Sequence, residues 1–296
     1  MGFIDYARSH SLEKDVLKLK IIIDPILKYP QLEQSIEGYS VTLPTPVLGE
    51  ETLSYLGYTF PVDNNTMLEV TRLFKASVYH LTAHAVVSNF HDFRKWKTGK
   101  NQHLAQFIPA LVEDLKVNVH IAKWYPDKVS ELAHTSALSL GRMRDIEGVA
   151  LTSTRLLTSL LLYANTGLKV YSKKDLDTVP VLYSMIENYK SVIMDSWIDE
   201  DLDISSEKVS LANKLYSVLI QNGPIIETPS LPFTENLGES SMFPDIQIYD
   251  LPNMDDLIAS ITENLGGSPA VEDQDSLRKV AESEALQVFE SHIIEK

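Results

Sequence analysis

The feature that most constrains the fold of this chain is a helical hydrophobic pattern that continues from Thr66 to Gly223. Apolar residues such as Leu111, Leu115 and Val119 recur at four-residue spacing, which is typical of helices that bury one face. The region has no alternating strand pattern of useful length, so we predict a mainly α fold. The predicted helices cover about residues 66–96, 109–125, 145–165, 179–197 and 206–221, with a further helix starting at 127 or 130.

Short local motifs predict where several of these helices begin and end. Thr66 is followed by Glu69 three positions later, which is the pattern of a capping box. Pro109 is tolerated in the first turn of a helix, and Pro126 predicts the end of the same helix. Gly167 is placed to close the helix over 145–165.

The two ends of the chain differ from this helical body. We expect residues 11–29 to be helical with a break at Pro25, and residues 40–46 and 58–61 to be extended. Six of the 14 prolines follow residue 223, among many acidic and small residues, which is typical of a linker. Two amphipathic segments stand out there, at 254–265 and 276–294. The predicted organisation is an N-terminal segment (1–65) packed on a helical domain (66–223), followed by an acidic, irregular extension (224–296).

Composition limits the functional classes. The chain has no cysteine, which excludes disulfides, thiolate metal sites and cysteine nucleophiles. Residues 224–296 contain 15 acidic and 3 basic residues, a net charge of 3 − 15 = −12 within the total of −15. This acidity argues against nucleic-acid binding, which needs clustered Lys and Arg. The first residues have no apolar core typical of a signal peptide, and no apolar run approaches a membrane span, so we expect a soluble, cytoplasmic protein without a membrane partner.

Histidines concentrate in one part of the predicted helical body. Six of the eight lie between positions 80 and 134. At 100° per residue, His80, His84 and His91 lie within about 40° of one another on one helix face. Imidazoles four residues apart can converge on one ion, so this pattern predicts a metal site for zinc or iron. The alternative is a set of histidines that only hydrogen-bond to their neighbours.

Carboxylates and imidazoles also share faces on the following helices. Glu113 and His120 are seven residues apart on the next predicted helix, and Glu131 and His134 form an E-x-x-H spacing. We therefore take His80, His84, Glu113 and His120 as the candidate metal ligands.

Two segments resemble a known family. They are Val78–Val86 (VYHLTAHAV) and Leu111–Pro126 (LVEDLKVNVHIAKWYP). Together they are similar to the zincin-like helical domain of von Willebrand A-domain proteins, of the nitric oxide reductase activation protein and cobaltochelatase large subunit type. The acidic C-terminal region resembles the linker of that family, although the D-x-S-x-S metal motif of the A domain itself is absent.

The resemblance implies roles for individual residues. His80 and His84 would bind zinc with Glu113 as the third ligand, and Asp114 would support the site. Leu81 occupies the place of the glutamate that activates water in active zincins, so peptide hydrolysis is not expected. Proteins of this family act with AAA+ ATPases that remodel a target metalloenzyme, which implies a protein partner of one of these two kinds.

Three functions follow from these observations. The first is an accessory or scaffold protein with a degenerate zincin-like domain, and the second is a helical-bundle metalloenzyme with an iron site made of His and Glu. The iron site would draw on seven residues, namely Glu69, His80, His84, Glu113, His120, Glu131 and His134. Such bundles normally carry two E-x-x-H motifs, and this chain has only Glu131–His134. The third is a helical interaction domain without metal.

Overall fold

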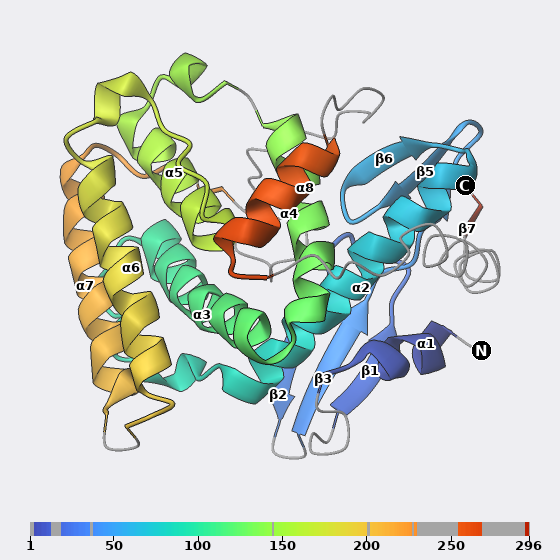
Figure 1. Ribbon diagram of the computed structural model, residues 1–296, viewed down its shortest axis with the longest axis horizontal. Coiled ribbons are helices and arrows are strands. Elements are labelled where there is room, and N and C mark those ends of the chain that lie inside the picture. The colour runs from blue at the N-terminus through green and yellow to red at the C-terminus, as the bar shows by residue number, and fades with distance from the viewer. Residues whose placement is uncertain are drawn as a thin grey trace.

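The fold is mainly α, and the long helix α2 connects a strand-rich N-terminal region to a group of further helices (Figure 1). The computed structural model describes residues 3–12, 19–35, 38–143, 145–199, 202–226, 228–229, 254–267 and 294–295. The α-helices are α1 (Phe3–His10), α2 (Asn64–Val87), α3 (Gln102–Trp124), α4 (Val129–Arg142), α5 (Thr152–Thr166), α6 (Val179–Asp195), α7 (Ile204–Gln221) and α8 (Met254–Asn264). Short 3₁₀ turns are η1 (Phe90–Phe93), η2 (Pro126–Lys128), η3 (Ile146–Gly148) and η4 (Lys173–Asp175).

The strands form two small sheets beside α2 (Figure 1). In the first sheet β3 (Gly38–Leu43) lies between β1 (Leu19–Ile23), which is parallel to it, and the antiparallel β2 (Gln31–Ser35). The second has the order β6 (Tyr58–Pro61), β5 (Thr52–Tyr55), β4 (Val47–Leu48) and β7 (Ile294–Glu295). Val41, Leu53 and Phe60 from these strands share one apolar core with Phe74 and Val78 of α2.

The helix expected over residues 11–29 is wrong. Residues 13–18 lie outside the described part of the chain, and Leu19–Ile23 is strand β1. The run Ile21-Ile22-Ile23 is β-branched and favours a strand once a partner is available, and β3 supplies that partner in parallel register. The extended segments expected at 40–46 and 58–61 are confirmed in outline by β3 and β6.

The helical body largely follows the predicted order, but several helix boundaries are shifted. The first helix ends at Val87 instead of continuing to residue 96, because the Asn89 side chain accepts a hydrogen bond from the backbone N–H of His91 and begins η1. Its start is capped by Asp63, which accepts the backbone N–H of Thr66, so the predicted capping box is not formed as expected. The next helix begins at Gln102, earlier than predicted, because Asn101 caps it, and Pro109 lies inside this helix.

The helix predicted over 145–165 begins only at Thr152, since Ile146–Gly148 forms the separate turn η3. The other remaining helices agree with the sequence pattern. Pro126 follows α3 directly, and Gly167 ends α5 in the left-handed conformation with φ of 69°. Leu111, Leu115, Leu157 and Leu160 lie in the large core shared by α3, α5, α6 and α7. The described residues between 66 and 223 contain no strand.

The C-terminal region contributes one described helix. The predicted amphipathic segment 254–265 forms α8, which packs on α4 through Ile261 against Ala133 and Ala137 (Figure 1). The second predicted segment, 276–294, lies outside the described residues except for Ile294. Among the helices that the structure describes, none combines the length and the apolar character needed to cross a bilayer.

Gly167 offers a test of the contact between α5 and α8. A Cβ at this position would lie 2.7 Å from Cβ of Asn264, and the backbone has a positive φ. We expect Gly167→Ala to lower the free energy of unfolding by about 1–2 kcal/mol, because both the left-handed conformation and the close approach favour glycine.

Urea denaturation measures this difference. The matched control is Gly148→Ala, since a Cβ at Gly148 meets no described atom within 4 Å. Equal stability of the two variants would contradict the role assigned to Gly167.

Candidate metal centre

Two helices bring two imidazoles and one carboxylate together. His80 and His84 are one turn apart on α2 and therefore share a face, and Asp114 projects toward them from α3. The relative exposures of these residues are only 0%, 2% and 2%, respectively. The group thus lies inside the interface between the two helices.

Their donor atoms form a small triangle. Nε2 of His84 lies 3.0 Å from Nε2 of His80 and 3.0 Å from Oδ1 of Asp114, and Nε2 of His80 lies 3.4 Å from the same oxygen. Zinc bound at 2.0–2.1 Å in a tetrahedron has ligand atoms about 3.3 Å apart. The three atoms therefore have nearly the spacing of one face of a zinc coordination shell.

The local electrostatics favour the protonation states that a metal needs. Burial lowers the pKa of His80, and the neighbouring His84 lowers it further against the opposing effect of Asp114. Burial alone would raise the pKa of Asp114, but hydrogen bonds and charge interactions with His80 and His84 lower it to about 2. Metal binding requires an ionised carboxylate and a neutral imidazole, and these two pKa shifts favour both forms.

A second contact orients His84. Its Nδ1 lies 2.7 Å from Oγ of Ser88, which directs Nε2 toward His80 and Asp114. Hydrogen bonding of the other ring nitrogen is the usual way in which proteins orient a metal-binding histidine. The His80 and His84 rings stand nearly perpendicular, with an interplanar angle of 84°.

One oxygen of this group is unsatisfied. Oδ2 of Asp114 is buried and has no hydrogen-bond partner among the described residues. A buried carboxylate oxygen without a partner is costly, and a bound ion or water is the ordinary explanation for it. The donor set and this oxygen both fit a metal ion.

Glu113, the expected third ligand, faces a different neighbour. Its Oε1 lies 2.6 Å from Nζ of Lys208 on α7, and its Oε2 accepts the backbone N–H of Asn89. Adjacent residues on a helix point about 100° apart, so the carboxylates of Glu113 and Asp114 cannot both face α2. Asp114 therefore takes the place that the sequence interpretation gave to Glu113.

The other candidate, His120, also lies outside the group. It is buried farther along α3, with its ring centroid 5.8 Å from that of Tyr125. His91 lies in η1 and is exposed. Of the four ligands inferred from the sequence, the structure brings together His80 and His84.

The residues proposed for an iron site are distributed over separate contacts. Glu131 pairs with Arg72, with 2.8 Å between the carboxylate and Nε, while His134 contacts Glu69. Both pairs join α4 to α2 instead of converging with Glu113. In the described residues, the one group with the geometry of a metal site is His80, His84 and Asp114.

The sequence shows that an acidic residue is available at this point of the helix, but it does not show whether Glu113 or Asp114 faces the histidines. Glu113 and Asp114 are consecutive acids on a helix with apolar residues on most sides. Only the orientation of α3 against α2 and α7 decides which acid meets the histidines.

Comparisons with known proteins add no assignment, since no family model, curated protein or solved structure matches this chain. The resemblance to zincin-like domains therefore stays a prediction from the two quoted segments.

The ion pair between Lys208 and Glu113 gives a test of the helix arrangement around the centre. Lys208 is 2% exposed, and its Nζ also contacts Asp92 at 2.7 Å and donates to the carbonyl oxygen of Asn89. We expect Lys208→Met to lower the free energy of unfolding by about 3–5 kcal/mol, because it leaves the buried Glu113 carboxylate without a counter-charge.

The double variant Lys208→Met with Glu113→Gln is the control, measured by the same denaturant titration. It removes both charges, so it should be clearly more stable than Lys208→Met alone. If the double variant is no more stable than the single one, the charge on Glu113 is not what Lys208 stabilises.

Proposed function

We propose that this protein binds one divalent transition-metal ion, zinc in the first place, through His80, His84 and Asp114. The observation that carries the proposal is the triangle of three buried donor atoms within 3.4 Å of one another. Two imidazole nitrogens and one carboxylate oxygen form a donor set that zinc binds readily. The unsatisfied Oδ2 of Asp114 supports the same conclusion.

We further propose that the centre stabilises the protein and does not hydrolyse substrates. The three ligands lie inside the α2–α3 interface, so an ion there would hold the two helices together. Leu81 follows the first histidine and is fully buried in the apolar core that α2 shares with the strands. This side chain cannot accept a proton from a metal-bound water, as the corresponding glutamate does in active zincins.

An accessory role follows from this proposal and from the resemblance of the two segments. The protein would act by binding a partner, either an AAA+ ATPase or a metalloenzyme during its assembly or activation. The iron-bundle alternative has less support, because Glu69, Glu113 and Glu131 each pair with a different residue.

Metal analysis tests the proposed site directly. We expect the purified full chain to contain one zinc ion per chain by elemental analysis, and zinc to raise the melting temperature of chelator-treated protein. A ligand present at 100 times its dissociation constant stabilises a folded protein by about 2.7 kcal/mol.

Substitutions identify the ligands. His84→Ala and Asp114→Asn should each abolish the zinc-dependent rise in melting temperature, whereas the exposed His103 permits His103→Ala as a control with a normal response. No zinc binding by the wild-type chain would contradict the proposal. A normal zinc response in both site variants would place the ion elsewhere, and two irons per chain would support the bundle enzyme.

A further inference from the structure

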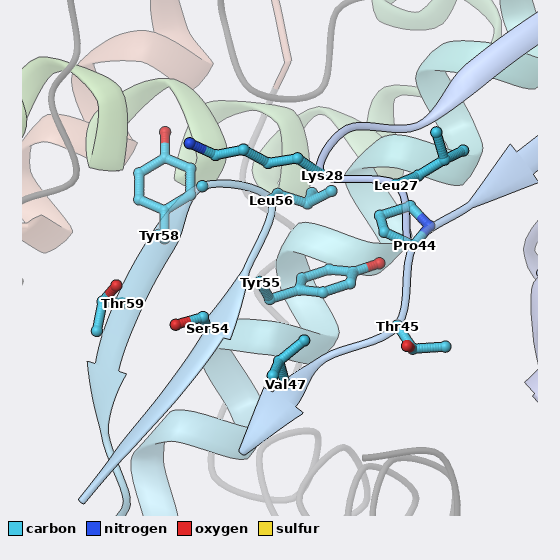
Figure 2. A pocket seen from close by; sticks show the side chains of 11 residues that line it. Leu27, Lys28, Pro44, Thr45, Val47, Ser54, Tyr55, Leu56, Tyr58 and Thr59 are labelled. Carbon is cyan, nitrogen blue, oxygen red and sulfur yellow. The ribbon is translucent and has the colours of Figure 1, made fainter. Parts of the chain in front are cut away.

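A cavity in the strand region lies apart from the metal centre, and its polar groups are engaged within the protein. It has a volume of about 210 Å³ and is lined by residues between positions 27 and 59. Lys28 and Tyr55 of this lining both have interactions within the protein, and the Lys28 ammonium lies 5.4 Å from the centroid of the Tyr29 ring. Figure 2 shows this ammonium beside Tyr58, away from the Tyr55 hydroxyl. The features that point to a partner lie elsewhere, at the ends of α3 and α6.

Two of the three tryptophans of the chain meet at the surface. Trp124 ends α3 and Trp197 follows α6, and their ring centroids are 6.0 Å apart. Trp197 packs partly on the large helical core, whereas Trp124 is 55% exposed. The third tryptophan, Trp96, is buried and donates its Nε1–H to Oδ1 of Asn213. Packing within the protein therefore covers Trp96 but leaves much of the Trp124 indole exposed.

Two further apolar side chains extend this surface. Met194, in the last turn of α6, is 49% exposed, and Ile198 is 87% exposed. The backbone N–H groups of Trp197 and Ile198 donate to the carbonyl oxygens of Met194 and Asp195, so the segment forms a tight turn that keeps these side chains close. We call the set Trp124, Met194, Trp197 and Ile198 the tryptophan patch. Exposed apolar groups that gather in this way, with Trp and Met among them, are typical of protein–protein contact surfaces.

The tryptophan patch has an acidic border. Residues 195–203 read DSWIDEDLD, with five acidic residues and no basic one. Asp195 and Asp199 in this segment are exposed, and the backbone N–H of Asp199 donates to the carbonyl oxygen of Asp195. A charge of the opposite sign comes from Lys123, whose ammonium lies 6.0 Å from the centroid of the Trp124 ring. This contact shows that the face of the Trp124 indole accepts a cation.

These charges limit what can cover the patch. Residues 224–296 contain 15 acidic and 3 basic residues, so the acidic border repels the C-terminal region of the same chain. A twofold contact with a second copy would place two acidic borders beside each other, because both subunits contribute the same surface to such an interface. An apolar surface with a negative rim instead complements a segment that carries apolar and basic side chains together.

We propose that the tryptophan patch is a docking site for a cationic amphipathic segment of a protein partner. Apolar side chains of this segment pack on Trp124, Trp197 and Ile198, and its Lys or Arg side chains pair with the acidic border. The proposal rests on the accessory role proposed above, to which it adds a surface and a partner chemistry. It does not depend on the metal ion, because the patch and the metal centre share no residue.

The probe for this surface is a fluorescently labelled amphipathic peptide of leucine and lysine, about 14 residues or four helical turns long. Its counterpart with glutamate in place of every lysine is the control peptide. In anisotropy titrations with the full chain, the lysine peptide should bind in the micromolar range and the glutamate peptide at least about tenfold more weakly, since only the first complements the acidic border. Raising the salt concentration from about 50 to 200 mM should weaken the binding, because exposed charges are screened.

One substitution tests the apolar contact. Trp124→Ala should weaken binding of the lysine peptide about tenfold, the effect of truncating one central tryptophan of an interface. Ile26→Ala is the control, since Ile26 is 91% exposed but lies between β1 and β2 in the strand-rich region. This control variant should bind the lysine peptide as the wild type does.

Two pairs of substitutions remove the same charge from different places. Asp195→Asn with Asp199→Asn should weaken binding about threefold and reduce its salt dependence, because two exposed charge pairs are lost. Asp255→Asn with Asp256→Asn, at the exposed start of α8, should leave the affinity unchanged. Lys123→Met removes the opposing charge beside Trp124 and should strengthen the binding.

Three results would overturn the proposal. They are equal binding of the two peptides, an unchanged affinity of Trp124→Ala, and an equal loss in the two aspartate pairs, which would indicate attraction to the net charge of the whole chain. The melting temperature of each variant shows whether it folds, and the substituted side chains are exposed.

The titration is repeated with chelator-treated protein, in which the lysine peptide should bind equally well. Peptide binding by a chain that takes up no zinc would contradict the metal centre alone. Zinc uptake by a chain that does not bind the lysine peptide would contradict the docking site alone.

Discussion

Helix α3 carries two consecutive buried carboxylates, and the arrangement of the helices depends on how each one is compensated. Glu113 meets the ammonium of Lys208 from α7, while Asp114 meets the imidazoles of α2. A helix separates neighbouring side chains by about 100°, so one partner element cannot serve both acids. Since an uncompensated buried carboxylate is strongly destabilising, α2, α3 and α7 must pack together for both acids to be buried.

The link between α2 and η1 connects these two contacts. Ser88 lies within hydrogen-bond distance of Nδ1 of His84, and the next residue, Asn89, contacts both Glu113 and Lys208 through its backbone. The early end of α2 is therefore part of the site, because a helix continuing beyond Val87 would remove these backbone groups from Glu113 and Lys208. The same short segment therefore orients the His84 imidazole and forms hydrogen bonds with both Glu113 and Lys208.

Helix α2 also connects the metal centre to the strand-rich region. Its His80 and His84 face Asp114 of α3, whereas Phe74, Val78 and Leu81 pack in one core with residues of the strands. Leu81 therefore faces the core between α2 and the strands, on a different side of the helix from the metal centre. This placement gives a physical reason for an apolar residue next to the first histidine.

The sequence alone determined the features that depend on neighbours along the chain. The mainly α fold, the helix ends at Pro126 and Gly167, and the shared face of His80 and His84 all follow from local periodicity and capping chemistry. Only the tertiary structure decided between Glu113 and Asp114, because the rotation of α3 against two other helices sets which carboxylate reaches the imidazoles. Likewise Ile21-Ile22-Ile23 became a strand because β3 lies beside it. Contacts between residues distant in the chain supply these outcomes, and no local pattern contains them.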